Sequence, residues 1–117
     1  MRRETLKFLF DAREACQVLE QFLRGRSFEE YQSDILLRSA IERQLTIVGE
    51  ALDQARKTDA SLEQLITDLR GIIKFRHILV HGYSAIRNDT VWGILKSDLP
   101  TLLAELGSLL GGDANTA

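Results

Sequence analysis

The sequence predicts an all-α fold, a compact up-and-down bundle of about four to five helices. Only one of the 117 residues is a proline and eight are glycines, so few positions force the chain to break. Over long stretches, apolar residues recur at spacings of three and four, which is the period of an amphipathic helix. The length and a hydrophobic content of 44% indicate one globular domain that buries its own core.

The first helix is expected at about residues 4–24, because one face of this stretch is apolar. Gly25 follows it as a natural stop, since glycine readily takes the left-handed conformation found at helix ends. The apolar face consists of Leu6, Leu9, Cys16, Leu19 and Leu23, widened by Phe8, Ala12, Ala15 and Phe22.

Residues 27–30, Ser-Phe-Glu-Glu, form a capping box, which predicts the start of a second helix over about residues 28–57. Gly49 lies inside this helix, although glycine there costs about 1 kcal/mol relative to alanine. We therefore expect another part of the chain to approach the backbone closely at Gly49. The apolar stripe of the helix consists of Ile41, Leu45, Val48, Leu52 and Ala55.

Residues 61–64, Ser-Leu-Glu-Gln, form a second capping box in its Gln form. The helix that starts there is expected to continue, with or without a kink at Gly71, as far as His81. Gly82 can stop it, and residues 83–88 are expected to connect it to the last helix.

The last helix is expected at about residues 90–110, with Asn88 or Asp89 as its cap. Pro100 lies inside it, which predicts either a kink or a fresh start capped by Asp98. Residues 111–117 are expected to form a flexible C-terminal tail, so the helical domain comprises residues 1–110.

The charge distribution limits the partners of the chain. A formal net charge of −2 gives no general attraction to nucleic acid or anionic membranes, so such binding needs a local patch. Residues 69–88 supply one, because they contain no Asp or Glu but include Arg70, Lys74, Arg76 and Arg87. The single cysteine excludes an intrachain disulfide and favours a cytoplasmic location. Neither a signal-peptide core nor an apolar run of membrane-spanning length is visible.

Inside this cationic window, residues 76–83 read Arg-His-Ile-Leu-Val-His-Gly-Tyr. Arginine is a fixed bidentate cation for phosphate oxygens, and histidine exchanges protons near neutral pH. One interpretation is a packed helix with structural histidines, and the other is a phosphate-handling site. Arg76 and His81 lie about 140° apart around an ideal helix, so a site that uses both would form at a groove edge or between two copies of the helix.

A metal site is a weaker hypothesis. His77 and His81 are four residues apart and could share a zinc ion. However, Ile78 stands where the zincin pattern requires a Glu, and no further ligand lies nearby. We therefore expect neither a metal nor another cofactor.

Four further residues have simpler interpretations than a part in a site. Arg43 and Glu50 lie on one side of the second helix, and an ordinary ion pair is preferred over a part in a site. Cys16 and Trp92 are expected to serve packing.

The spacing Arg76-x4-His81-x-Tyr83 resembles the Arg-x4-His-x-Tyr motif of HEPN-domain ribonuclease toxins of the HepT type. His77 stands where that family most often has Asn, so we give it a supporting role only. The resemblance extends over nearly the whole chain in the family's order, at residues 22–31, 40–43, 48–51, 89–94 and 98–100.

The resemblance implies an HEPN-like bundle that forms a homodimer or a higher oligomer, with both motifs facing a shared cleft. It also implies metal-independent cleavage of RNA, with Arg76 and His81 as the catalytic residues. Such a protein is the toxin of a type VII-like toxin–antitoxin pair. Its partner, an MntA-like nucleotidyltransferase antitoxin, would silence it by attaching AMP to Tyr83. Arg43 and Glu50 remain secondary candidates.

Two other functions stay open at this point. The cationic cleft could hold a nucleotide or substrate as a non-catalytic subunit of a nucleotidyltransferase complex. Alternatively, the chain could be a helical scaffold that only oligomerises. Arg76, His81 and Tyr83 together favour the enzyme, because a pure binding module has no need of a proton-transfer group.

Overall fold

The computed structural model describes residues 1–111, apart from the side chain of Tyr83, and it confirms the all-α prediction. The predicted flexible tail therefore lies, from residue 112 on, outside the described residues. Among the described helices, none has both the length and the apolar character that crossing a membrane requires.

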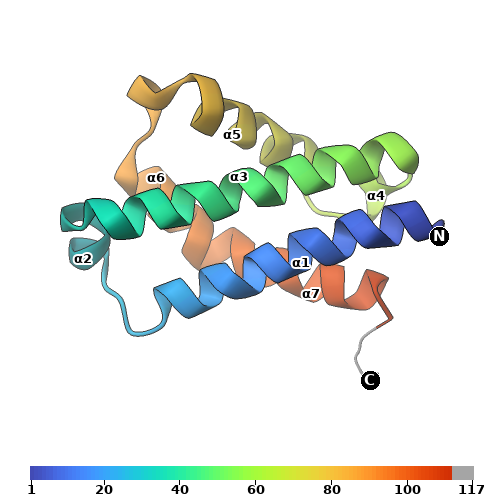
Figure 1. Cartoon of the computed structure of the whole chain (residues 1–117), viewed down its shortest axis with the longest axis horizontal. Coiled ribbons are helices and arrows are strands. Elements are labelled where there is room, and N and C mark those ends of the chain that lie inside the picture. Colours follow the sequence, from blue (N-terminus) through green and yellow to red (C-terminus); the bar gives the residue numbers. More distant parts are fainter. Residues whose placement is uncertain (112–117) are drawn as a thin grey trace.

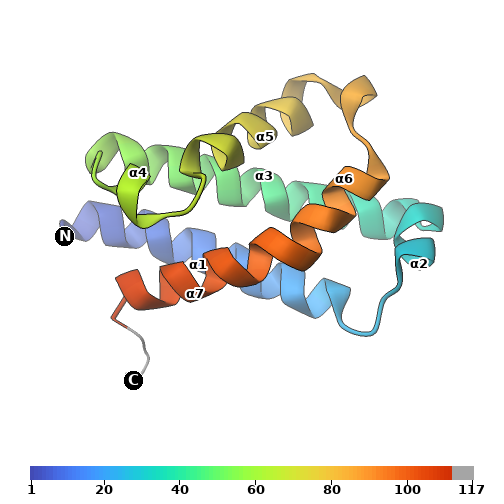
Figure 2. The same cartoon turned by 180° about the vertical axis from the view of Figure 1, so that it is seen from behind.

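Two long antiparallel helices, α1 (Arg3–Leu23) and α3 (Ile35–Thr58), form one layer of the molecule (Figure 1). The helix α7 (Leu99–Leu109) packs against α1 from behind, as Figure 2 shows. The helix α5 (Leu69–His81) lies along the other side of α3. Because α5 packs mainly on α3, much of its surface faces outward.

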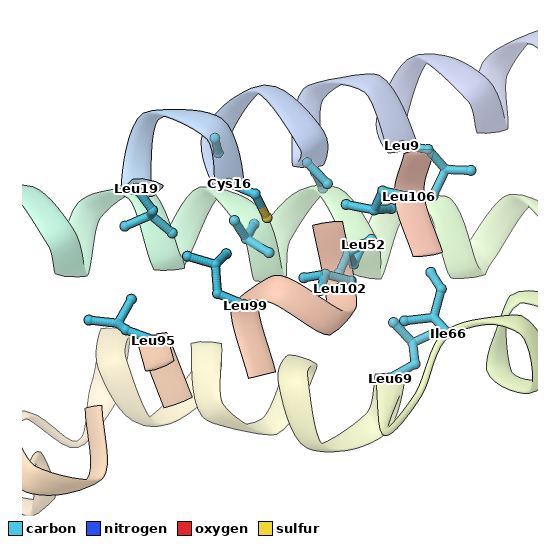
Figure 3. Close-up of a cluster of buried hydrophobic side chains, with 14 of the residues drawn as sticks. Leu9, Cys16, Leu19, Leu52, Ile66, Leu69, Leu95, Leu99, Leu102 and Leu106 are labelled. Atoms are coloured by element: carbon cyan, nitrogen blue, oxygen red, sulfur yellow. The ribbon is translucent and has the colours of Figure 1, made fainter. Parts of the chain in front are cut away.

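The core lies where α1, α3 and α7 meet, and the linker that precedes α5 closes one end of it (Figure 3). Cys16 is fully buried in this core, as expected. The largest fully buried side chains of the core include Leu9, Leu19, Ile41, Leu52, Ile66, Leu69 and Leu106.

The predictions for the first helix and for the first capping box are confirmed. α1 ends at Leu23, and Gly25 follows with a φ of +73°. Ser27 Oγ accepts a hydrogen bond from the Glu30 N–H, and Glu30 Oε1 accepts one from the Ser27 N–H. The chain therefore enters its next helix in the way that the local sequence predicts.

The prediction of one continuous helix over residues 28–57 is wrong. The structure has a short α2 (Phe28–Ser33), a break at Asp34, and then α3. The Asp34 carboxylate caps the second piece by accepting a hydrogen bond from the Leu37 N–H at 3.0 Å. The break lets α2 turn so that the buried Tyr31 packs against Trp92, with ring centroids 5.6 Å apart.

The prediction of a second capping box at residues 61–64 is also wrong. Ser61 makes no side-chain cap; its hydroxyl donates to Asp59 Oδ1 at 2.6 Å instead. The short α4 (Leu62–Leu65) does not continue into the next helix, because the chain breaks after it and Asp68 takes a φ of +53°. Gly71 lies inside α5, where a Cβ would collide with the Asp68 carboxylate. The break thus precedes the predicted kink site.

The last part of the chain begins after a 3-10 turn, η1 (Tyr83–Ala85). α6 (Asn88–Gly93) starts two residues earlier than predicted, and Arg87 occupies its cap position without a side-chain hydrogen bond. A π-helical segment, η2 (Ile94–Asp98), joins α6 to α7, and Asp98 makes no side-chain cap either. α7 nevertheless starts afresh at Leu99, with Asp98 at its cap position and Pro100 in its first turn, where the missing N–H of proline costs no helix hydrogen bond.

Candidate active site

The helix that carries the motif, α5, is the least buried of the long helices. Leu69 is its only buried residue, and Val80 is 46% exposed. The helix ends at His81, and Gly82 caps it by donating its N–H to the Ile78 carbonyl at 2.8 Å. The predicted stop at Gly82 is therefore confirmed, and it places His81 in the last turn of the helix.

Arg76 lies where α5 packs closely against the backbone of α3. A Cβ built on Gly49 would overlap the Cβ of Arg76 and would lie 2.6 Å from its Cγ. The expected close approach at Gly49 is confirmed, and the approaching residue is the arginine of the motif. Glycine here lets the stem of Arg76 lie directly on the backbone of α3.

Two carboxylates of α3 face the guanidinium of Arg76. Its Nη1 lies 3.5 Å from Glu50 Oε1, and its Nη2 lies 3.7 Å from Asp53 Oδ2. The Arg76 side chain is 20% exposed, so it is held at the edge of the α3–α5 contact rather than in the core. The positive charge of Arg76 is thus partly neutralised by carboxylates of the same chain.

Asp53 is the residue that the sequence interpretation missed. It also accepts from Arg56 at 2.6 Å and lies 3.6 Å from Lys57. Partial burial acts to raise the pKa of Asp53, but the hydrogen bond from Arg56 and the charges of Lys57, Arg56 and Arg76 outweigh it and lower the pKa. The sequence does contain a signal for Asp53, because it lies beside the apolar stripe of its helix. A charge buried there needs partners of opposite charge.

Arg43 and Glu50 do not form the ion pair that was the preferred interpretation. Within the described residues, Glu50 pairs with Arg76, and Arg43 has no ion pair. Both side chains line one open groove between α1 and α3. Glu50 therefore belongs to the surroundings of Arg76, whereas Arg43 lies beyond them.

The two histidines of the motif lie together on the outside of α5. The ring centroids of His77 and His81 are 4.6 Å apart, with an angle of 49° between the rings, and both residues are exposed. Within residues 1–111 no hydrogen bond joins Arg76 to His81. Both residues lie on the one continuous helix α5, on which a separation of five residues corresponds to about 140° for ideal geometry.

Tyr83 begins the 3-10 turn directly after Gly82, and the Ala85 N–H donates to the Gly82 carbonyl at 2.8 Å. Its side chain lies outside the part of the chain that the structure describes. The position of its backbone, one residue beyond the helix stop, is as the sequence predicts.

The basic window of residues 69–88 is partly neutralised by carboxylates outside it. Arg70 pairs with Glu63 at 2.9 Å, and Arg87 pairs with Asp89 at 3.0 Å. Lys74 is the one cation of the window without an ion pair in the described structure. The free positive charge near the motif is therefore smaller than the sequence suggests.

The described residues contain no group of three side chains that could hold a metal ion, so His77 and His81 have no third protein ligand there. Cys16 is also unsuited to nucleophilic chemistry. Burial and the nearby Glu20 raise the pKa of its thiol to about 12.

Comparisons with known proteins identify the family of the chain. A family model described as ribonuclease HepT-like matches residues 12–109. A protein of Thermococcus cleftensis named "Probable ribonuclease HepT" is 28% identical over 93% of this chain and 98% of its own length. A protein of Methanocaldococcus jannaschii that is named as an RNase is 26% identical over 90% of this chain and 95% of its own. No solved structure gives a significant match. Because the family model covers most of the chain, the protein belongs to the ribonuclease HepT-like family.

Proposed function

We propose that the protein is a metal-independent endoribonuclease in which Arg76 and His81 cleave RNA. The observation that carries the proposal is the placement of the motif on α5. Arg76 is fixed against α3 over Gly49, and His81 is exposed in the last turn of the same helix. Membership of the ribonuclease HepT-like family supports RNA as the substrate.

In the proposed reaction, a ribose 2′-oxygen attacks the adjacent phosphorus, and the bond from phosphorus to the 5′-oxygen of the next nucleotide breaks. His81 takes the 2′-hydroxyl proton or returns a proton to the leaving 5′-oxygen. Arg76 stabilises the charge that grows on the non-bridging phosphate oxygens. The products are a 2′,3′-cyclic phosphate and a 5′-hydroxyl, and no metal is required.

The proposal includes a homodimer that completes the site. One protomer supplies a fixed Arg76 and an exposed His81 that diverge around α5. His77, Val80 and His81 are all exposed, and their spacings of three and four residues place them on one outward strip of α5. In a two-fold dimer packed along this strip, the partner's His81 takes the second proton-transfer role.

Cleavage of a single-stranded RNA in the presence of EDTA tests this function. His81→Ala should lose about 10²–10⁴-fold in rate, because general acid–base catalysis contributes that much. His77→Ala is the matched control, since it removes a neighbouring exposed imidazole of the same helix, and its loss should be much smaller. Full activity of His81→Ala, or an absolute requirement for added zinc, would contradict the mechanism.

We further propose that the enzyme is the toxin of a type VII-like toxin–antitoxin pair and that a nucleotidyltransferase antitoxin attaches AMP to Tyr83. Tyr83 lies just beyond the end of α5, where an added phosphate would compete with RNA for Arg76. A competing role for its ring is stacking on an RNA base.

Mass spectrometry after co-expression with the adjacent nucleotidyltransferase tests the modification. The chain has only two tyrosines, and the other, Tyr31, is fully buried. AMP should therefore appear on the wild type and be absent from Tyr83→Phe. If Tyr83→Phe is still modified and still silenced, another hydroxyl is the target or the antitoxin acts by binding alone.

A further inference from the structure

We propose that Glu50 is a substrate-mimicking carboxylate, which occupies the side of Arg76 that an RNA phosphate takes, while Asp53 stays in place and positions the guanidinium. The inference rests on the proposed role of Arg76 in RNA cleavage. It adds to that role a competitor residue and a positioning residue, both from α3.

The two carboxylates differ in how far they can move. Glu50 lies 3.5 Å from Arg76 Nη1 with a side chain that is 54% exposed, whereas Asp53 lies 3.7 Å from Nη2 with a side chain that is 12% exposed. In the described structure the only ion pair of Glu50 is the one with Arg76. Glu50 can therefore turn into the solvent without breaking any other ion pair.

Asp53, in contrast, is fixed by several cations. Arg56 donates a hydrogen bond to its Oδ1 at 2.6 Å, and Lys57 lies 3.6 Å from its Oδ2. Its lowered pKa means that the carboxylate stays ionised at neutral pH, so its attraction for Arg76 persists. Asp53 therefore remains beside Arg76 whether Glu50 is present or displaced.

Arg76 cannot follow Glu50 outward. The Cβ and Cγ of Arg76 lie on the backbone of α3 at Gly49, so the stem of the side chain is fixed at its base. An incoming anion must therefore meet the guanidinium where Glu50 now lies, on the exposed side of the α3–α5 contact.

The chemistry of the exchange is favourable. A carboxylate and a phosphate each offer paired oxygens to the same N–H groups of arginine. Neither carboxylate contact of Arg76 has hydrogen-bond geometry, so both are loose ion pairs. A phosphate that makes direct hydrogen bonds can replace Glu50, which neutralises part of the charge of Arg76 in the resting protein.

Binding of a 2′-O-methyl oligoribonucleotide tests the inference, because this RNA keeps its phosphates but cannot be cleaved. Glu50→Gln should tighten binding about two- to fivefold, the range expected for removing one exposed competing ion pair. Glu20→Gln on α1 makes the same change in net charge at an exposed site and should have a smaller effect. Glu50→Asp keeps the charge but shortens the reach, so it should show part of the gain.

The tighter RNA binding of Glu50→Gln must also depend on the charge of Arg76. In an Arg76→Ala background, Glu50→Gln should no longer tighten binding, which a double-mutant cycle measures. In cleavage assays Glu50→Gln should lower KM, whereas Asp53→Asn should lower kcat, because the guanidinium is then poorly positioned. Thermal unfolding of each variant checks that the fold is intact.

The inference is overturned if Glu50→Gln binds no more tightly than Glu20→Gln, or if the gain persists without Arg76. These binding results can be interpreted whether or not the protein cleaves RNA as proposed. If the wild type fails to cleave RNA, or Arg76→Ala cleaves it normally, the ribonuclease mechanism fails, while the binding cycle still shows whether Glu50 competes for Arg76.

Discussion

Gly49→Ala tests the contact on which the site depends. By helix propensity alone, this change inside α3 should stabilise the protein by about 1 kcal/mol. The structure predicts the opposite. The added Cβ would lie 2.6 Å from Arg76 Cγ and 3.6 Å from Arg76 Cα, and it would overlap Arg76 Cβ.

The size of the effect follows from which atoms must move. The nearest atoms are the first ones of the Arg76 side chain, so they cannot give way without a shift of the α5 backbone. Overpacking of this kind typically costs about 1–3 kcal/mol, which exceeds the gain in propensity. After the propensity gain of about 1 kcal/mol is subtracted, we expect the free energy of unfolding to fall by up to about 2 kcal/mol, and Tm to fall by about 4 °C per kcal/mol.

Gly93→Ala is the matched control for the propensity effect. Gly93 also lies in a helix, but a Cβ there would meet no atom within 4 Å. This variant should be stabilised by up to about 1 kcal/mol. Urea denaturation of both variants gives the comparison, and RNA cleavage by Gly49→Ala should fall because Arg76 is displaced.

The reasoning would be refuted if Gly49→Ala were as stable as Gly93→Ala or more stable than the wild type. That result would mean that α5 does not press against α3 at this position. The proposed fixation of Arg76 would then lose its structural basis.

Three further changes have defined outcomes. Ser27→Ala removes the cap of α2 and should cost about 1 kcal/mol in urea denaturation. Asp53→Asn should lower stability at neutral pH and have little effect in strong acid. The folded-state pKa of Asp53 is lowered, so its ionised form stabilises the fold above the unfolded-state value of about 3.9, and this contribution is lost as the pH falls through the folded-state pKa. The Cys16 thiol, with its pKa raised to about 12, should react with Ellman's reagent at pH of about 8 only after unfolding.

Local patterns predicted much of the fold correctly. The first helix, the capping box at Ser27 and the stop at Gly82 depend on residues close together in the chain, and the structure confirms all three. The close approach at Gly49 was also predictable, because an unfavourable residue in a helix interior indicates a packing demand. The identity of the approaching residue was not.

The errors arose where tertiary packing decides between two local options. An aspartate such as Asp34 can lie inside a helix or can cap the start of a new one. The packing of Tyr31 against Trp92 favours the cap. Likewise, the partners of Arg76 depend on how α5 is aligned along α3. Glu50 and Asp53 become neighbours of Arg76 only through that alignment, so the spacing of residues along the chain could not reveal them.

Two hydrogen bonds between Glu105 and Thr67 tie α7 to the start of the helix that carries the motif. Glu105, near the end of α7, accepts from both the N–H of Thr67 at 3.0 Å and its hydroxyl at 2.6 Å. Thr67 lies in the linker that leads into α5, so α7, which is synthesised after α5, holds the start of the helix that carries the motif. A nascent chain that still lacks α7 lacks this tie, and α5 then packs mainly on α3. For a ribonuclease, this order of assembly means that the start of the motif helix is held in full only after α7 has been synthesised.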